Sequence, residues 1–126
     1  MSEESELLGA GALIVTPTYN ERYNLPVFVR ATLGVAPGAH ILIVDDNSPD
    51  GTGDVADELA VSDERITVMH RAGKMGLGTA YVQAFAQGLA EGYDYFFEMD
   101  TDLSHDPNYL PAFFEAGQPA ALGDFV

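Results

Sequence analysis

Cysteine is absent from this chain of 126 residues, which excludes disulfides, zinc–thiolate sites, iron–sulfur clusters and a cysteine nucleophile. Basic residues are scarce, with five Lys and Arg against twenty Asp and Glu, so the net charge is −15. Proteins that bind nucleic acid need clustered Lys and Arg, so nucleic acid is excluded as a partner and a bare anionic membrane is disfavoured. The acidity suits a divalent cation, or a ligand that carries one; a soluble, self-repelling surface is the alternative interpretation.

Long apolar runs are also missing. The longest, such as residues 39–44, are far too short to span a bilayer, and no basic leader precedes an apolar run. We therefore expect a soluble cytoplasmic protein. The length favours one domain, and 47% hydrophobic with 20% charged residues is globular rather than disordered composition.

Short apolar runs alternate along the chain with segments of helical periodicity. The runs predict buried strands at residues 12–16 (stopped by Pro17), 41–44, 66–69 and 95–99. The segments between them predict helices that begin at Asn24, which would cap its helix, at Thr52, and after a glycine loop at residues 70–78, with a last helix at 108–115.

Each predicted helix has an apolar face. The inward residues are expected to be Leu25, Phe28, Val29 and Leu33 in the first helix, Val55, Ala56 and Leu59 in the second, and Leu77, Tyr81, Phe85 and Leu89 in the third. Alternating strands and helices with short connections predict an α/β fold, a parallel sheet with helices on both faces. We expect a flexible acidic N-terminus at residues 1–10 and one domain at 11–126.

Acidic residues follow the predicted strands, at the edge where open parallel sheets bind ligands. Asp100 and Asp102 follow the last strand, and such oxygen-only ligands suit Mg²⁺ or Mn²⁺. The alternative is that both are solvated loop residues. Asp45 and Asp46 follow the second strand and should point apart, so that one faces the cleft and accepts hydrogen bonds from a base or a ribose, unless both cap the turn. Asp50 and Gly51 are interpreted as structural.

Two further segments carry candidate ligand contacts. After the first strand, Tyr19 could lie against a planar base and Glu21 could accept from a sugar hydroxyl; alternatively Pro17 only stops the strand and the rest is solvated. Lys74 stands beside glycines at a helix start, which resembles an anion site, although a tight turn explains the glycines equally well. The loop lacks the third glycine of a dinucleotide fingerprint, because Tyr81 occupies that place. His105 has no Ser/His/Asp arrangement around it, so no nucleophile is predicted.

Four motifs stand in order along the chain: PTYNERYNLP at residues 17–26, VDDNSPDGT at 44–52, GLGTAY at 76–81 and MDTDLSH at 99–105. Together they resemble the polyprenol (dolichol) phosphate mannosyltransferases, which are inverting family-2 glycosyltransferases of the GT-A fold. The resemblance covers roughly residues 12–115 and implies a Rossmann-like GT-A nucleotide-sugar-binding domain.

The resemblance also implies roles for individual residues. The nucleotide contacts would be Pro17, Tyr19, Glu21, Val44 and Asp46. Asp100 and Asp102 would hold the metal and the diphosphate with the Thr101 backbone nearby, and Ser104 stands where a glutamine of the family often joins the metal. Asp102 is the residue we expect to be catalytic.

The implied reaction transfers mannose from GDP-mannose to a polyprenyl or dolichyl phosphate with inversion, assisted by Mg²⁺ or Mn²⁺. The acceptor phosphate is ionised at neutral pH, so no general base is needed. The alternative function is a non-catalytic module that binds a nucleotide diphosphate and acts with a partner protein.

Beyond the last predicted helix the resemblance implies an arginine-bearing segment and an acceptor-binding half, and no arginine follows Arg71 here. We therefore expect a truncated GT-A domain that binds donor but transfers mannose poorly or not at all. Peripheral association with the cytoplasmic membrane face would depend on that missing C-terminal part, and an exposed sheet edge would favour self-association.

Overall fold

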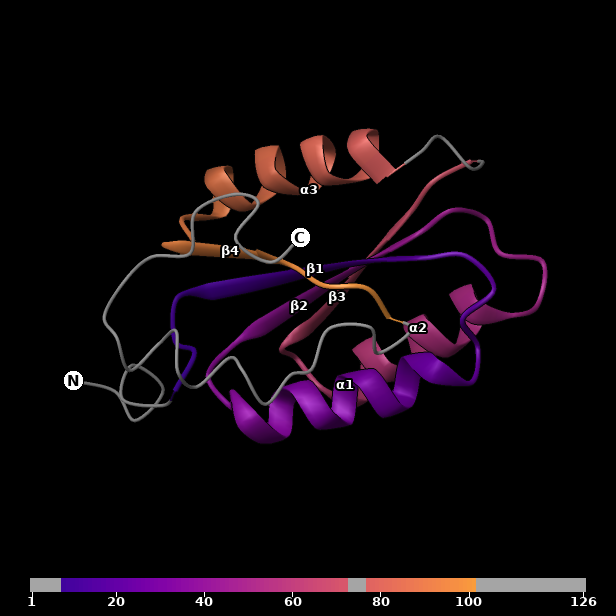
Figure 1. Ribbon diagram of the computed structural model, residues 1–126, viewed down its shortest axis with the longest axis horizontal. Coiled ribbons are helices and arrows are strands. Elements are labelled where there is room, and N and C mark those ends of the chain that lie inside the picture. Colours follow the sequence, from indigo (N-terminus) through magenta and orange to yellow (C-terminus); the bar gives the residue numbers. More distant parts are fainter. Residues whose placement is uncertain (1–7, 73–76, 102–126) are drawn as a thin grey trace.

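The computed structural model describes residues 8–72 and 77–101 of the chain (Figure 1). Its elements follow the order β1 (Ala12–Thr18), α1 (Asn24–Val35), β2 (His40–Asp45), α2 (Thr52–Ser62), β3 (Ile66–His70), α3 (Leu77–Glu91) and β4 (Tyr95–Glu98). All the described elements stand where the sequence predicts them, with ends that differ by one or two residues. The predicted helix at 108–115 lies outside the described residues.

The strands form one parallel sheet in the order β3-β2-β1-β4. α1 and α2 cover one face of this sheet and α3 covers the other, as Figure 1 shows. This arrangement confirms the predicted α/β fold with helices on both faces. Among the described residues, no helix combines the length and the apolar character that crossing a membrane requires.

Both faces of the central strands are buried, which explains why these strands are continuously apolar rather than alternating. In β1 the side chains of Ala12 and Ile14 pack with α1 and α2, whereas those of Leu13 and Val15 pack beneath α3. The sheet therefore separates two apolar clusters, one on each of its faces, and side chains pack against its backbone from both sides.

β1 continues through Pro17 to Thr18, so the prediction that Pro17 stops the strand was wrong. The backbone of Val15 faces β4, because the Met99 N–H donates to the Val15 carbonyl (3.0 Å). Backbone groups alternate sides along a parallel strand, so Pro17 also faces β4. Since β4 ends at Glu98, no strand there requires the N–H that proline lacks.

α1 buries the predicted face, Leu25, Phe28, Val29 and Leu33. Its capping was predicted wrongly, because Tyr23 is the N-cap residue and Asn24 is already helical. The Asn24 side chain instead donates to Glu21 Oε2 at 3.1 Å, so it ties the helix to the preceding loop.

In the part of α3 whose side chains are described, the helix packs on the sheet through Ala84, Phe85 and Gly88. Of the predicted stripe, Phe85 is confirmed, and the side chains of Leu77 and Tyr81 lie outside the described ones. Leu89 was expected on the inner face and is 69% exposed. The reason is geometric: at 3.6 residues per turn, a stripe of residues four apart drifts by about 120° over twelve residues. The small residues at 84 and 88 replace Leu89 at the contact and let the helix approach closely.

Gly88 is expected to be essential for this approach. A Cβ atom there would collide with Phe96 Cε1 and would stand 2.9 Å from Leu13 Cδ2. We predict that Gly88→Ala lowers the free energy of unfolding by about 1–3 kcal/mol, the usual cost of overpacking, in urea denaturation. Gly34→Ala in α1 is the matched control, because its Cβ meets nothing within 4 Å and should stabilise by up to about 1 kcal/mol. Equal effects of the two changes would contradict the close packing of α3.

Candidate functional site

The strand order reverses at β1, which creates the site. From β1 the chain passes through α1 on one face to β2 and later returns through α3 on the other face to β4. The connections that reach β2 and β4 therefore lie on opposite faces of the sheet, and open α/β sheets bind ligands at the carboxyl ends of the strands at such a switch point. Thr18, Asp45 and Asp100 lie at this edge, at or just after the ends of β1, β2 and β4.

The loops after β1 and β2 are joined to each other by hydrogen bonds. Backbone N–H groups of the first loop donate to side chains of the second: Asn20 N to Ser48 Oγ (3.1 Å), Glu21 N to Thr52 Oγ1 (3.0 Å) and Arg22 N to Asp50 Oδ2 (3.3 Å). The left-handed conformations of Asn20 (φ 58°) and Asn47 (φ 54°) turn the chain in each loop. The motifs at 17–26 and 44–52 thus form one layer, as their position at the strand ends predicts.

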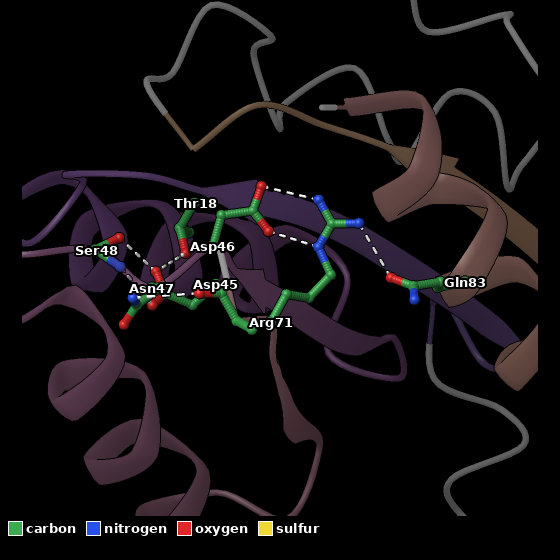
Figure 2. Close-up of polar contacts among 8 residues, drawn as sticks. Thr18, Asp45, Asp46, Asn47, Ser48, Arg71 and Gln83 are labelled. Carbon is green, nitrogen blue, oxygen red and sulfur yellow. Dashed lines mark hydrogen bonds and ion pairs between the residues drawn. The ribbon is translucent and has the colours of Figure 1, made fainter. Parts of the chain in front are cut away.

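Asp45 and Asp46 turn to different partners, as expected for adjacent residues at a strand end (Figure 2). Asp45 is buried, and its carboxylate accepts from Thr18 Oγ1 (2.7 Å), Ser48 Oγ (2.6 Å) and Ser48 N (3.2 Å). These bonds hold the end of β1 and the turn after β2 together.

Asp50 has a similar local role at the start of α2. It accepts from the Thr52 N–H at 3.0 Å and from the Thr52 hydroxyl, and that hydroxyl bond is the main reason why the pKa of Asp50 is lowered. Gly51 follows with φ +92°, a conformation that favours glycine. The structural interpretation of Asp50 and Gly51 is therefore confirmed.

Asp46 forms a buried, two-pronged ion pair with Arg71. Arg71 Nε lies 2.6 Å from Asp46 Oδ1 and Arg71 Nη2 lies 2.9 Å from Oδ2, while Nη1 donates to Gln83 Oε1 at 3.0 Å (Figure 2). The side chains are only 3% and 7% exposed. The hydrogen bond with Asp46 is the main cause that raises the pKa of Arg71, so the guanidinium stays charged.

Sequence reasoning did not pair Arg71 with Asp46, because the contact follows from the pairing of β2 with β3, which the sequence alone does not specify. The register aligns Asp45 with His70, so the residues one step beyond each strand end are neighbours. The Arg71 N–H also donates to the Asp45 carbonyl (2.8 Å), which carries the pairing one residue past the ladder. The contacts of Thr18, Ser48 and Gln83 were missed as well, and nothing in the sequence pattern singles out Gln83 among the polar residues of α3.

The predicted nucleotide contacts occupy different environments. Tyr19 is 40% exposed at the end of β1, and Pro17 and Glu21 are half-buried. Val44 is fully buried in the cluster beneath α3. The edge of the sheet therefore brings Pro17, near the end of β1, together with Tyr19, Glu21 and Asp46 on the neighbouring loops, whereas Val44 lies in the core behind them. Their ligand contacts stay predictions.

Asp100 and Thr101 follow β4 beside the end of β1, and Thr101 is buried. Burial, and then the charge of Asp100, raises the pKa of the neighbouring Glu98 carboxyl. Negative charge is therefore already unfavourable at this strand end. Asp102, Ser104 and Lys74, predicted from the sequence to bind metal or anion, lie outside the described residues.

The donor chemistry of the edge fits a hard divalent cation, because carboxylates are the ligands that Mg²⁺ and Mn²⁺ prefer. The described residues alone do not complete such a site: no cluster of three or more His, Asp or Glu side chains occurs among them. The Asp45 and Asp46 carboxylates already accept several hydrogen bonds. Of the residues predicted to hold metal, Asp100 is the one that the structure places at the switch point.

A hollow of about 190 Å³ lies at the carboxyl ends of β2 and β3, lined by Asp45, Asn47, Ser48, Gly51, Gly53, Asp54, His70 and Arg71. It is smaller than the roughly 300–1,000 Å³ of small-molecule sites, so it would hold only part of a nucleotide sugar. A larger hollow of about 340 Å³ between α1 and α2 includes none of the predicted site residues.

Comparison with known proteins identifies the class to which this fold and site belong. Residues 13–118 match glycosyl transferase family 2, and the chain belongs to that family. Membership confirms the predicted transferase class and the resemblance seen in the four motifs.

Its relatives are more specific. The chain is 50% identical over 115 residues to the polyprenol monophosphomannose synthase of Mycolicibacterium smegmatis, covering 88% of this chain and 43% of the relative. It is 47% identical over 110 residues to the undecaprenyl-phosphate mannosyltransferase of Micrococcus luteus, covering 87% and 45%. The chain thus spans less than half the length of these curated relatives.

A solved structure supports the fold. The mannosyltransferase PcManGT from Pyrobaculum calidifontis, in complex with GDP-Man and Mn²⁺, has a TM-score of 0.56 and 19% identity, and the match covers 63% of this chain and 24% of that one. The likeness shows that the two share the fold.

Breaking the Asp46–Arg71 pair is expected to lower the free energy of unfolding strongly. Removing one partner leaves a buried uncompensated charge, so Arg71→Met and Asp46→Leu should each lower the free energy of unfolding by about 3–5 kcal/mol, and the double variant by much less than their sum. A double-mutant cycle in urea measures this.

Arg65→Met is the control for that cycle, since the Arg65–Asp63 pair is 32% and 25% exposed and should cost only about 1 kcal/mol. Additive effects at residues 46 and 71 would show that the two side chains are not coupled.

Proposed function

We propose that this chain forms the donor-binding part of an inverting glycosyltransferase that moves mannose from GDP-mannose to a polyprenyl phosphate. The support comes from the relatives, whose names specify polyprenol or undecaprenyl phosphate and mannose, at about half identity over nearly nine-tenths of this chain. GDP-Man and Mn²⁺ are bound in the solved mannosyltransferase that shares the fold.

One structural observation carries the proposal. The loops at residues 17–26 and 44–52, which are far apart in sequence, interlock at the carboxyl edge of the sheet, next to Asp100 at the switch point. This is the edge at which doubly wound sheets bind nucleotides. The nucleoside would lie over the β1 and β2 loops, and the diphosphate would extend toward the end of β4.

Specific roles follow for the residues at this edge. Tyr19 is exposed enough to stack on a base, and the half-buried Glu21 carboxylate would accept from a ribose hydroxyl. Asp46 would contact the nucleoside while it remains paired with Arg71, since each carboxylate oxygen has a second lone pair.

The chemistry requires no base from the protein. An acceptor phosphate oxygen attacks the anomeric carbon from the face opposite the diphosphate, the bond from that carbon to the diphosphate oxygen breaks, and GDP leaves with the electron pair. A divalent cation held by Asp100 and Asp102 would offset the charge that GDP gains. The protein's own residues bind and orient the donor, and such positioning supplies much of the rate.

A lipid acceptor would place the reaction at a membrane surface. We therefore include peripheral association with the cytoplasmic membrane face in the proposal. With a net charge of −15, the chain offers little attraction for an anionic lipid phosphate, and Arg71 is already paired with Asp46.

The proposal predicts metal-dependent binding of GDP. In calorimetric titration of the chain with GDP, UDP and GDP-mannose, each with and without Mn²⁺, GDP and GDP-mannose should bind more tightly than UDP and more tightly with the metal. Asp102→Ala should abolish the enhancement by Mn²⁺, because it removes one of two predicted ligands. Glu58→Ala on α2 makes the same change in net charge away from the site and should bind as the parent does.

Two outcomes would contradict parts of the proposal. If Asp102→Ala binds GDP–Mn²⁺ as well as the parent, the metal assignment is wrong. If GDP and GDP-mannose bind but no transfer to a short polyprenyl phosphate occurs even in a protein with the length of its relatives, the chain is a nucleotide-binding module rather than part of an enzyme.

A further inference from the structure

Two buried threonine hydroxyls join β1 to the turn after β4. Thr16 Oγ1 lies 2.5 Å from Thr101 Oγ1, across 85 residues of sequence, and Thr101 Oγ1 lies 3.3 Å from the Pro17 carbonyl oxygen, to which it donates. Thr16 is fully buried and Thr101 is 2% exposed. No family motif or predicted role calls for a hydroxyl at residue 16.

The direction of the hydrogen bonds follows from the proton count. A threonine hydroxyl carries one proton, and that of Thr101 points to the Pro17 carbonyl. The bond between the two hydroxyls must then be donated by Thr16. The three groups form a relay in one direction, from the Thr16 hydroxyl to the Thr101 hydroxyl to the Pro17 carbonyl.

The relay lies where the regular sheet stops. The Met99 N–H makes a backbone bond to the Val15 carbonyl, one residue past the end of β4. Pro17 is the next residue of β1 that faces β4, and proline has no N–H to donate. The Thr101 hydroxyl donates to the Pro17 carbonyl, and this bond connects the turn after β4 to β1 beyond the last backbone hydrogen bond.

We propose that Thr16 and Thr101 are positioning residues that fix the turn after β4, which begins with Asp100, against the end of β1. Thr101 directly follows Asp100, so its side chain, pinned in the core, sets where the backbone at Asp100 leaves the sheet. Asp102, the second predicted ligand, is the next residue in the sequence and lies outside the described residues. The link to metal and diphosphate rests on the proposed function; the link between the relay and the turn does not.

The first experiment tests the turn alone, by amide hydrogen exchange of the whole chain. Thr16→Val and Thr101→Val keep the side-chain shape and remove a hydroxyl. Thr16→Val removes one bond and should accelerate exchange of the Met99 amide about tenfold, roughly what one net hydrogen bond corresponds to. Thr101→Val removes both bonds of the relay and should accelerate it at least as much. Exchange of Leu42 in β2 should stay unchanged in both variants. Thr101→Ser keeps the hydroxyl and should restore the slow exchange of Met99.

A matched control is present in α1. Thr32 is fully buried, and within the described part of the chain its hydroxyl has no hydrogen-bond partner. Thr32→Val makes the same chemical change in the core without breaking a bond, so Met99 should exchange as in the parent. The double variant Thr16→Val/Thr101→Val should match Thr101→Val, because loss of the Thr101 hydroxyl already removes both bonds of the relay.

The second experiment measures GDP binding with and without Mn²⁺. The two valine variants should lose about tenfold of the enhancement by Mn²⁺, as expected for one lost hydrogen bond at the turn, with metal-free affinity unchanged, and Thr101→Ser should retain it. A loss of metal-free affinity as large as the loss with Mn²⁺ would overturn the positioning role.

The two experiments separate the two ideas. If the parent shows no GDP–Mn²⁺ binding, the proposed function fails, and the exchange of Met99 still decides whether the relay holds the turn. Unchanged Met99 exchange in both valine variants, or equal acceleration at Leu42, would overturn the relay itself.

Discussion

The rest of the structure depends on the placement of β1 between two strands that arrive by opposite routes. Each of its backbone groups must find a partner on one side or the other, alternating between β2 and β4 residue by residue. β2 extends to the end of β1 and β4 does not, so one side of the β1 terminus stays paired while the other opens. That asymmetry creates the crevice and allows Pro17 to lie in a central strand. It also leaves the Pro17 carbonyl to accept a hydrogen bond from Thr101, which in turn is bonded to Thr16.

The buried ion pair extends the same constraint to the neighbouring strand ends. Asp46 and Arg71 stand one residue past β2 and β3, where the ladder has ended and water would otherwise reach the core. A buried pair of this kind is weak evidence for stability, since its attraction has to offset the desolvation of both charges. Its geometry does specify position, because the planar guanidinium orients Asp46 and, through Gln83, connects that carboxylate to α3.

Most of the fold could be predicted from the sequence, because strands buried on both faces produce apolar runs that nothing else in the chain imitates. The errors concern features that periodicity does not encode. Pro17 could be placed in the strand only by knowing that β4 ends early, and Leu89 was assigned inward because a spacing of four residues ignores helical drift. The position of the site could be predicted from strand ends alone, whereas the Asp46–Arg71 and Thr16–Thr101 contacts required the strand order, which a sequence without its tertiary pairing does not specify.

Most of the acidic side chains at the carboxyl edge of the sheet already accept hydrogen bonds from the protein, so fewer of them can bind a cation than their number suggests. Asp45 accepts three hydrogen bonds from Thr18 and Ser48, Asp50 accepts from Thr52 and Arg22, and Asp46 accepts two from Arg71. These donors make the carboxylates compatible with one another at close range, so that the loops can fold despite the net charge. A cation recruited to this edge would therefore depend on the turn after β4. There burial, and then the charge of Asp100, raises the pKa of Glu98, so this strand end disfavours negative charge on Glu98 and added positive charge would offset that effect.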